Sequence, residues 1–356
     1  MISPRLLALI RCPDCGGALG GGQPELTCAA CHRRFAASAD YLVLHPGVSY
    51  AEQTKYLDEA LHTDARQDHV SPPLLSAKIR NDVLRQFLAP GPADTVIDLG
   101  CGSGKAMVWN ADLGAHQVGI DVSPYFAQEA QASVDLVLGD LRQLPFAPGA
   151  FTKGYALDVF EHVSHDALVE VLHEAARVLA PGGALFVYSH VRKNSRLAAG
   201  LKVVNALARW IERRGWMDLS RERLRKSDHL NPLTDIPDLE AVVASAGFRI
   251  ARIRYYTPAV GAVVENIFMR MAEHWLSRRA ARRARSAGMA IGTAEAARQA
   301  RSAAKATVDA RGLSYLALRA ATWAMKLDIL LFGRVRSGPF FALLVKDAAP
   351  GKDRRA

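Results

Sequence analysis

Short apolar runs rich in β-branched residues alternate with stretches of helical periodicity along most of the chain. Such runs are typical of buried parallel strands, because these strands contact helices on both faces of their sheet. The runs lie at residues 95–99, 117–120, 134–138, 151–157, 184–188, 248–256 and 340–346. The pattern predicts an α/β fold with a doubly wound, mostly parallel sheet, whose ligand binds at the carboxyl ends of the strands.

Two longer helical stretches interrupt this alternation. The first, about residues 191–235, contains an amphipathic run in which Leu201, Val204, Ala208 and Ile211 share one face. The second, about residues 258–337, separates the last two predicted strands. We expect both insertions to form a helical cap over the ligand site.

The second insertion also allows a different interpretation. It opens with apolar residues on one helical face: Val260, Val263, Val264, Ile267, Phe268, Met271 and Trp275. A basic segment follows at residues 278–285, and residues 313–332 are strongly apolar but contain Arg319, Lys326 and Asp328. These charges disfavour a membrane span, so a helix lying in the membrane interface is the alternative to a cap. The side chains that would enter the head groups are Trp323, Leu327, Ile329 and Leu330. A nucleic-acid platform is a third interpretation, although no aromatic residues for base stacking interrupt the arginines.

The composition indicates a globular protein with acidic partners. Half of the residues are hydrophobic, 22% are charged, and the formal net charge is +10. A basic chain favours nucleic acid, anionic head groups or phosphorylated substrates. The apolar run at residues 1–10 is too short for a secretory signal, and no uncharged run is long enough to span a bilayer. We therefore expect a cytoplasmic protein, with peripheral contact at the inner membrane surface as the alternative.

Four cysteines near the N-terminus form two C-x-x-C pairs, Cys12 with Cys15 and Cys28 with Cys31. Two such pairs can close a tetrahedral site, which suits zinc and leaves no open coordination position. Redox-active pairs are the alternative. The spacing predicts a structural zinc ribbon over residues 1–45, with short strands near residues 25–27 and 41–44.

A glycine-rich turn follows the first predicted strand of the sheet. Gly100, Gly102 and Gly104 come directly after Asp98-Leu99, and glycine permits a close backbone approach to a ligand. The D-x-G-x-G-x-G pattern differs from the dinucleotide fingerprint and lacks the lysine of a P-loop. Asp121 ends the next strand, about 20 residues later, where a carboxylate can accept ribose hydroxyls.

Five motifs between residues 98 and 183 resemble, in the same order, class I S-adenosylmethionine (SAM)-dependent methyltransferases of the ubiquinone/menaquinone type, the methyltransferase type 11 superfamily. The motifs are D-L-G-C-G-S-G, G-I-D-V-S, G-D-L-x-x-L-P-F, D-V-F-E-H-V and R-V-L-A-P-G-G. The N-terminal segment resembles small zinc-ribbon proteins that activate methyltransferases, and the zinc finger of bacterial rRNA guanine methyltransferases.

The resemblance implies SAM as cofactor and the following binding residues: Asp98, Gly100, Gly102, Gly104, Asp121, Asp140 and Leu141. The glycines would cradle the methionine and ribose parts, with Asp98 orienting their loop. Asp121 would hold the ribose, and Asp140 with Leu141 would contact the adenine.

The resemblance also places Asp158 near the sulfonium and the methyl acceptor. Many such enzymes need no strong base, but an unactivated hydroxyl would require one, and histidine has the best-suited pKa. His162, His190 and His229 are the candidates. Stabilisation of the loop after the fourth strand is the alternative role for Glu161 and His162.

These observations predict a SAM-dependent methyltransferase that acts on a small-molecule or lipid-like acceptor. RNA methylation, with the ribbon and basic insertions binding nucleic acid, is one alternative, and a non-catalytic SAM-binding scaffold is another. The expected organisation is a zinc ribbon at 1–45, a linker with N-terminal helices at 46–92, a methyltransferase domain at 93–347 and a flexible tail at 348–356.

Overall fold

The computed structural model describes residues 2–47, 57, 70–193, 198–220, 223, 227, 229–256, 259–286 and 312–347. The tail expected at 348–356 and much of the expected linker lie outside these residues. The division into domains stays a prediction.

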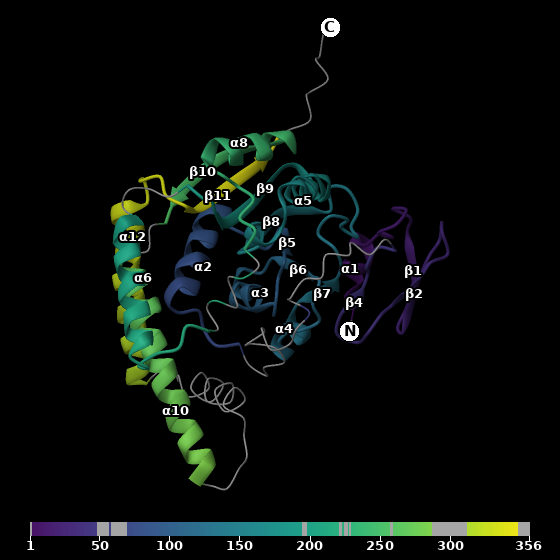
Figure 1. Cartoon of the computed structure of the whole chain (residues 1–356). Coiled ribbons are helices and arrows are strands. Elements are labelled where there is room, and N and C mark those ends of the chain that lie inside the picture. Colours follow the sequence, from purple (N-terminus) through teal and green to yellow (C-terminus); the bar gives the residue numbers. More distant parts are fainter. Residues whose placement is uncertain are drawn as a thin grey trace.

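An eight-stranded sheet forms the centre of the molecule (Figure 1). Its strands are β4 (Leu42–Val43), β5 (Thr95–Leu99), β6 (His116–Asp121), β7 (Asp135–Leu138), β8 (Phe151–Leu157), β9 (Leu179–His190), β10 (Phe248–Tyr255) and β11 (Pro339–Lys346). They lie in the order β10-β11-β9-β8-β5-β6-β7-β4. Neighbours from β4 to β9 are parallel, whereas β11 is antiparallel to both β9 and β10. The predicted doubly wound, mostly parallel sheet is confirmed.

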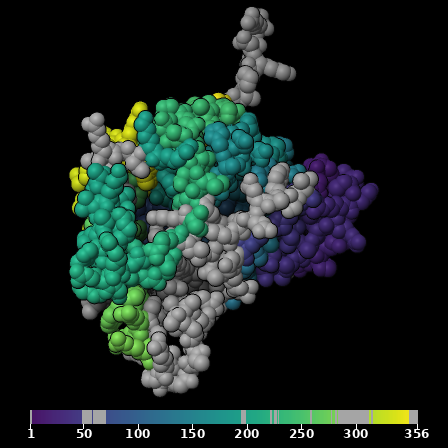
Figure 2. All heavy atoms as spheres, viewed as in Figure 1, coloured from purple at the N-terminus to yellow at the C-terminus, as the bar shows by residue number. Residues whose placement is uncertain are grey.

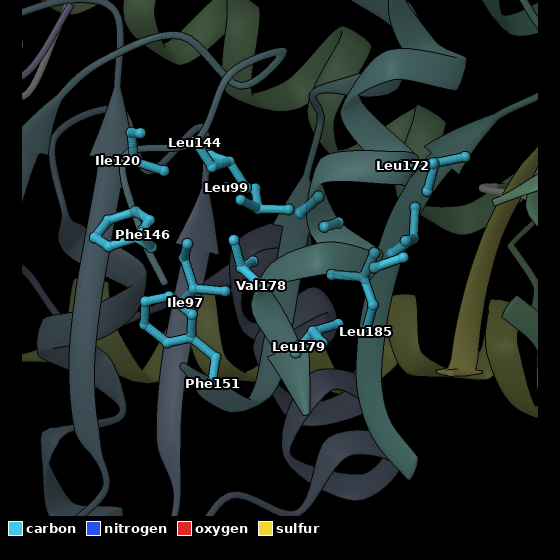
Figure 3. Packing of buried hydrophobic residues seen from close by; sticks show 14 of the residues in the cluster. Ile97, Leu99, Ile120, Leu144, Phe146, Phe151, Leu172, Val178, Leu179 and Leu185 are labelled. Atoms are coloured by element: carbon cyan, nitrogen blue, oxygen red, sulfur yellow. The ribbon is translucent and has the colours of Figure 1, made fainter. Parts of the chain in front are cut away.

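Helices cover both faces of this sheet, because alternate side chains of each strand point to opposite faces. Ile97 belongs to the core shared with α5 (His165–Val178) and α8 (Ile236–Ser245), whereas its neighbour Val96 belongs to the core on the other face. That second core contains residues of α2 (Leu75–Leu88), α3 (Lys105–Trp109) and α4 (Gln128–Ser133). Figure 3 shows Ile97 and Leu99 packing with Phe151 and Val178 in the first core.

The N-terminal ribbon lies against the β7 edge of the sheet (Figures 1 and 2). It consists of α1 (Pro4–Leu9) and the three-stranded sheet of β1 (Leu19–Gly22), β2 (Glu25–Cys28) and β3 (Arg34–Ala36). The expectation that residues 41–44 form a strand of the ribbon itself is wrong. Leu42 and Val43 instead pair with Val137 and Leu138 of β7, because the exposed edge of β7 offers unpaired backbone groups.

The described residues of the two insertions form a group of packed helices, named the cap, and its expected position over the ligand site stays a prediction. Its elements are α6 (Ala198–Arg213), α9 (Ala259–Val263), η5 (Val264–Met269), α10 (Arg270–Ser286) and α12 (Leu313–Phe332), with short 3₁₀ turns η3 (Ala111–Leu113) and η4 (Phe160–His162) elsewhere. Both α6 and α12 pack against α9, and α12 also packs against α2. The buried carboxylate of Asp328 accepts hydrogen bonds from the amides of Val260 and Gly261 at 2.9 and 2.7 Å. In this way α12 caps the N-terminus of α9.

One expected face of the cap is only partly buried. Ile267 is buried as expected, but Phe268 and Trp275 expose 63% and 59% of their surface. Residues 264–269 form a π-helical turn, which has more residues per turn than an α-helix. Because of this turn, residues on its two sides no longer follow one regular α-helical period. Apolar residues that would share one face of a regular α-helix therefore point in different directions here.

Within the described residues, no helix combines the length and the apolar composition needed to cross a membrane.

Candidate functional site

The glycine-rich loop joins β5 to α3 at the carboxyl edge of the sheet. All three glycines have positive φ, at +75° for Gly100, +55° for Gly102 and +78° for Gly104. A Cβ at Gly100 would lie 2.6 Å from Val159, and one at Gly104 would lie 2.7 Å from Ala130. A Cβ at Gly102 would meet no atom within 4 Å. Gly102 is therefore the loop position whose open side leaves room for a ligand.

Asp121 ties the end of β6 to this loop. Its Oδ2 accepts a hydrogen bond from the amide of Gly102 at 2.7 Å, and its Oδ1 accepts from the amide and hydroxyl of Ser123 at 2.9 and 2.7 Å. Each carboxylate oxygen has two lone pairs, so Oδ2, which accepts only one hydrogen bond from the described residues, retains capacity for one further donor. Asp98 lies at the end of β5 and is buried, and burial together with the nearby charge of Asp121 raises the pKa of its carboxyl well above the usual range.

The segment after β7 contains Asp140 and Leu141. The Asp140 carboxylate accepts from Arg142 at three positions: the amide at 2.8 Å, Nε at 3.1 Å and a guanidinium nitrogen at 2.9 Å. The ribbon contacts the same segment, since Gln143 donates to the carbonyl of Pro13 at 2.5 Å and Arg11 donates to Pro145 at 2.9 Å. The conformation of the expected adenine segment thus depends on Arg142 and on the N-terminal ribbon.

Asp158 begins the turn after β8, with a left-handed φ of +56°. Its amide donates to the carbonyl of Tyr188 at 3.0 Å, and its carboxylate pairs with Arg80 of α2. The Arg80 guanidinium lies 5.3 Å from the centre of the Tyr188 ring. Burial lowers the pKa of Arg80, but the charge of Asp158 and the neighbouring Tyr188, Glu265 and Tyr256 together raise this pKa above its usual value. No local pattern in the sequence predicts this ion pair between Arg80 and Asp158.

A carboxyl group and three histidines gather beside Asp158. Glu161 exposes 1% of its surface, accepts from the Ser189 hydroxyl at 2.8 Å and has its Oε1 3.7 Å from Nδ1 of His190. The His229 ring lies 4.7 Å from that of His162 and 5.5 Å from that of His190, measured between ring centres. Burial, reinforced by the charge of Asp158, raises the pKa of Glu161 to about 8.

Asn231 holds the His229 segment against this group. Its amide donates to the Glu161 carbonyl at 3.1 Å, and its side-chain nitrogen donates to the His229 carbonyl at 3.2 Å. Its Oδ1 atom is buried and has no hydrogen-bond partner among the described residues. Sequence reasoning missed Asn231, although its neighbour Pro232 marks a turn there.

The histidine group and the glycine loop are adjacent. β5 and β8 are neighbouring strands, and Val159, between Asp158 and Glu161, packs against Gly100. The structure therefore brings Asp158, His162 and His190 to the same edge of the sheet as Gly102 and Asp121.

The four ribbon cysteines lie together. Their sulfur atoms are all within 4.8 Å of one another, with Cys12 to Cys31 at 3.7 Å and Cys15 to Cys28 at 3.5 Å. Tetrahedral zinc with bonds of about 2.3 Å would separate its sulfur ligands by about 3.8 Å. Backbone amides, that of Cys31 foremost, lower the pKa of Cys28 to about 6, and burial raises that of Cys12 to about 12. The donor set and its spacing fit a tetrahedral thiophilic ion.

Comparison with known proteins gives a consistent assignment. Residues 97–187 match the family described as "Methyltransferase domain". A ubiquinone biosynthesis O-methyltransferase of Azorhizobium caulinodans is 27% identical over 198 residues, which cover 52% of this chain and 73% of the relative. A probable tRNA methyltransferase of Mus musculus is 33% identical over 108 residues, covering 30% of this chain and 24% of the relative.

Among solved structures, a cyclopropane synthase of Mycobacterium tuberculosis is 16% identical with a TM-score of 0.47, and the match covers 83% of this chain and all of that one. The chain spans only 24% to 38% of the length of several curated relatives. The domain match and the ubiquinone-biosynthesis relative thus show that residues 97–187 are similar to the domain of SAM-dependent methyltransferases.

Proposed function

We propose that this protein transfers the methyl group of SAM to a small-molecule or lipid-like acceptor. The proposal rests mainly on one observation. The open side of Gly102 and the fixed carboxylate of Asp121 lie on the same sheet edge as the Asp158 and histidine group. A cofactor side and an acceptor side would therefore adjoin each other.

On the cofactor side, SAM supplies an activated methyl group on a sulfonium when it is bound. Gly102 would allow the backbone to approach the methionine and ribose parts, and Oδ2 of Asp121 would accept from a ribose hydroxyl. Leu141 and the Asp140 segment would contact the adenine. The buried carboxyl of Asp98, whose pKa burial raises, would support the loop from the end of β5.

On the acceptor side, the residues offer a base and a partner for it. His190 would take the proton of a hydroxyl acceptor, and Glu161, whose Oε1 lies 3.7 Å from Nδ1 of His190, would help to position the imidazole ring. Asp158, held by Arg80, would orient a polar group of the acceptor, and the buried Oδ1 of Asn231 would accept from a donor. One relative is named as an O-methyltransferase of ubiquinone biosynthesis, and this similarity supports a lipid-like hydroxyl compound as the acceptor.

The decisive test is transfer of label from methyl-labelled SAM to separated lipid, metabolite, RNA and protein fractions of a cell extract. We expect label in the lipid or metabolite fraction, with loss of transfer in Asp121→Ala. Asp166→Ala, which changes an exposed acid on the neighbouring helix, is the matched control and should retain transfer. Label in RNA would instead support RNA methylation. If no fraction leads to formation of S-adenosylhomocysteine, the protein would be interpreted as a non-catalytic SAM-binding scaffold.

The role of His190 has its own test. If it is the general base, transfer should decrease as pH falls below the histidine pKa, and His190→Gln should lower the rate by about 10²–10⁴-fold and remove this pH dependence. SAM affinity should not change. A variant with the rate and pH profile of the parent protein would exclude His190 as the base.

We also propose that the four cysteines hold a structural zinc ion. Closed four-thiolate sites leave no position for substrate, and a module of this size has too little core to fold without such support.

A further inference from the structure

Four of the five tryptophans of the chain are exposed, and all four belong to the cap or its flanking turns. Trp210, Trp216, Trp275 and Trp323 expose 42%, 56%, 59% and 65% of their surface. Cores normally take up such side chains, and large exposed apolar patches mark interaction sites. Helices α6, α10 and α12 carry Trp210, Trp275 and Trp323, and Trp216 follows α6. The three helices lie together on the side of the molecule opposite the ribbon (Figure 1).

The exposed apolar residues of α12 form a face of their own. Leu316, Trp323, Leu327 and Leu330 recur at helical spacing and are each at least 45% exposed. The fold does not need them for packing, because Thr322, Met325 and Asp328 make up the buried face of the same helix. Trp323, Leu327 and Leu330 are exposed, as entry into the head groups would require, and that entry stays a prediction. The expectation was wrong for Ile329, which packs against the core, and the neighbouring Lys326 pairs with Asp82 at 2.7 Å.

A second exposed face lies on α6. Val203, Leu207 and Trp210 are exposed at helical spacing, whereas Ala208 and Ile211 are buried against Ile267. Helix α6 packs on α9 and η5, with Ala208 and Ile211 in the shared core and Asn205 accepting from Asn266 at 3.1 Å. Helices α6 and α12 therefore each have one face for the fold and one face turned to the surroundings.

Basic side chains accompany these faces. Lys202, Arg209, Arg213, Arg278 and Arg319 are exposed on the three helices. Arg214 lies 4.7 Å from the centre of the Trp210 ring, and Arg279 lies 5.3 Å from that of Trp275. The acids of these helices are engaged within the protein: Glu212 with Arg223, Glu273 with Arg270, and Asp328 with the α9 amides. The surface thus combines apolar side chains with positive charge.

We propose that this surface, defined by the exposed residues of α6, α10 and α12, binds the head-group region of an anionic membrane. Tryptophan and leucine enter the boundary between head groups and acyl chains, while arginine stays with the phosphates. No described helix crosses a bilayer, so this contact lies along the membrane surface. RNA binding would use basic side chains with aromatic rings for base stacking, a role that the exposed valine and leucines of α6 and α12 cannot fill. The proposal concerns where the protein docks and does not depend on the acceptor.

Vesicle flotation with the full-length protein tests this proposal. We expect flotation with vesicles of phosphatidylcholine and phosphatidylglycerol, and much less with phosphatidylcholine alone. Trp323→Ala combined with Leu330→Ala should reduce partitioning at least about tenfold, because both side chains leave the membrane. Arg319→Glu should reduce it by at least about fivefold, since each basic residue contributes about that factor near an anionic surface.

Arg34→Glu, which changes an exposed arginine of the ribbon, is the matched control and should float like the parent protein. Thermal unfolding of each variant should match that of the parent, because the changed residues are exposed. Absence of flotation with both vesicle types at low salt would overturn the proposal. So would a stable dimer, seen by light scattering, that the Trp323 and Leu330 changes convert to monomer, or RNA binding that these changes weaken while flotation persists.

Discussion

The pH dependence of stability should reveal the buried carboxyl of Glu161. Its pKa lies at about 8 in the folded protein and at its ordinary value of 4.5 in the unfolded chain. Between these two values the folded state holds a proton that the unfolded state has lost, so the free energy of unfolding falls as pH rises. The slope is at most about 1.4 kcal/mol per pH unit, and the accumulated loss at about pH 7 is about 3 kcal/mol.

The variant Glu161→Gln isolates this contribution. The amide has almost the same shape, can still accept from the Ser189 hydroxyl and does not titrate. The stability difference between the variant and the parent protein should therefore change with pH in favour of the variant, by about 2 kcal/mol between pH 5 and pH 7. Urea unfolding at several pH values with zinc held constant measures it. Asp166→Asn, at an exposed acid, is the control and should show no such trend.

Parallel stability curves for parent and Glu161→Gln would refute the argument, because they would mean that the carboxyl titrates normally despite its burial. A variant that gains stability but loses methyl transfer would indicate that the protein tolerates a destabilising buried acid for the sake of its chemistry.

Three further predictions concern the two ligand sites. Asp121→Ala should weaken SAM binding by about 1.5–3 kcal/mol in calorimetry with the fold intact, since charged hydrogen bonds are lost, and unchanged affinity would exclude the proposed ribose site. Gly102→Ala should lower SAM affinity and cost only about 1–2 kcal/mol of folding stability through backbone strain. Gly100→Ala should lower the melting temperature more than Gly102→Ala does, because its Cβ would meet Val159. Equal decreases in melting temperature for the two variants would contradict this difference. Elemental analysis should find one zinc per chain, and its absence from protein purified without chelator would refute the metal site. Cys12→Ser should unfold the ribbon and weaken SAM binding without abolishing it.

Local patterns in the sequence determined the sheet and the chemistry of its edge. The β-branched run at 95–99 corresponds to β5, and the glycines after it have the positive φ that only glycine adopts at little cost. The four cysteines were identified by their spacing alone, and the structure brings their sulfur atoms together. These features are local or strictly periodic, so the chain encodes them within a few residues.

Only the tertiary structure decided which distant groups meet. Arg80 pairs with Asp158 across 78 positions of sequence, and Asn231 positions His229 beside Glu161, although neither contact has a local pattern. β4 pairs with β7 of the central sheet and does not join the ribbon sheet, because the edge of β7 has unpaired backbone groups within reach. The sequence showed that the cap helices are amphipathic, but which of their apolar faces is buried depended on the packing against α9 and α2, which is a property of the assembled fold.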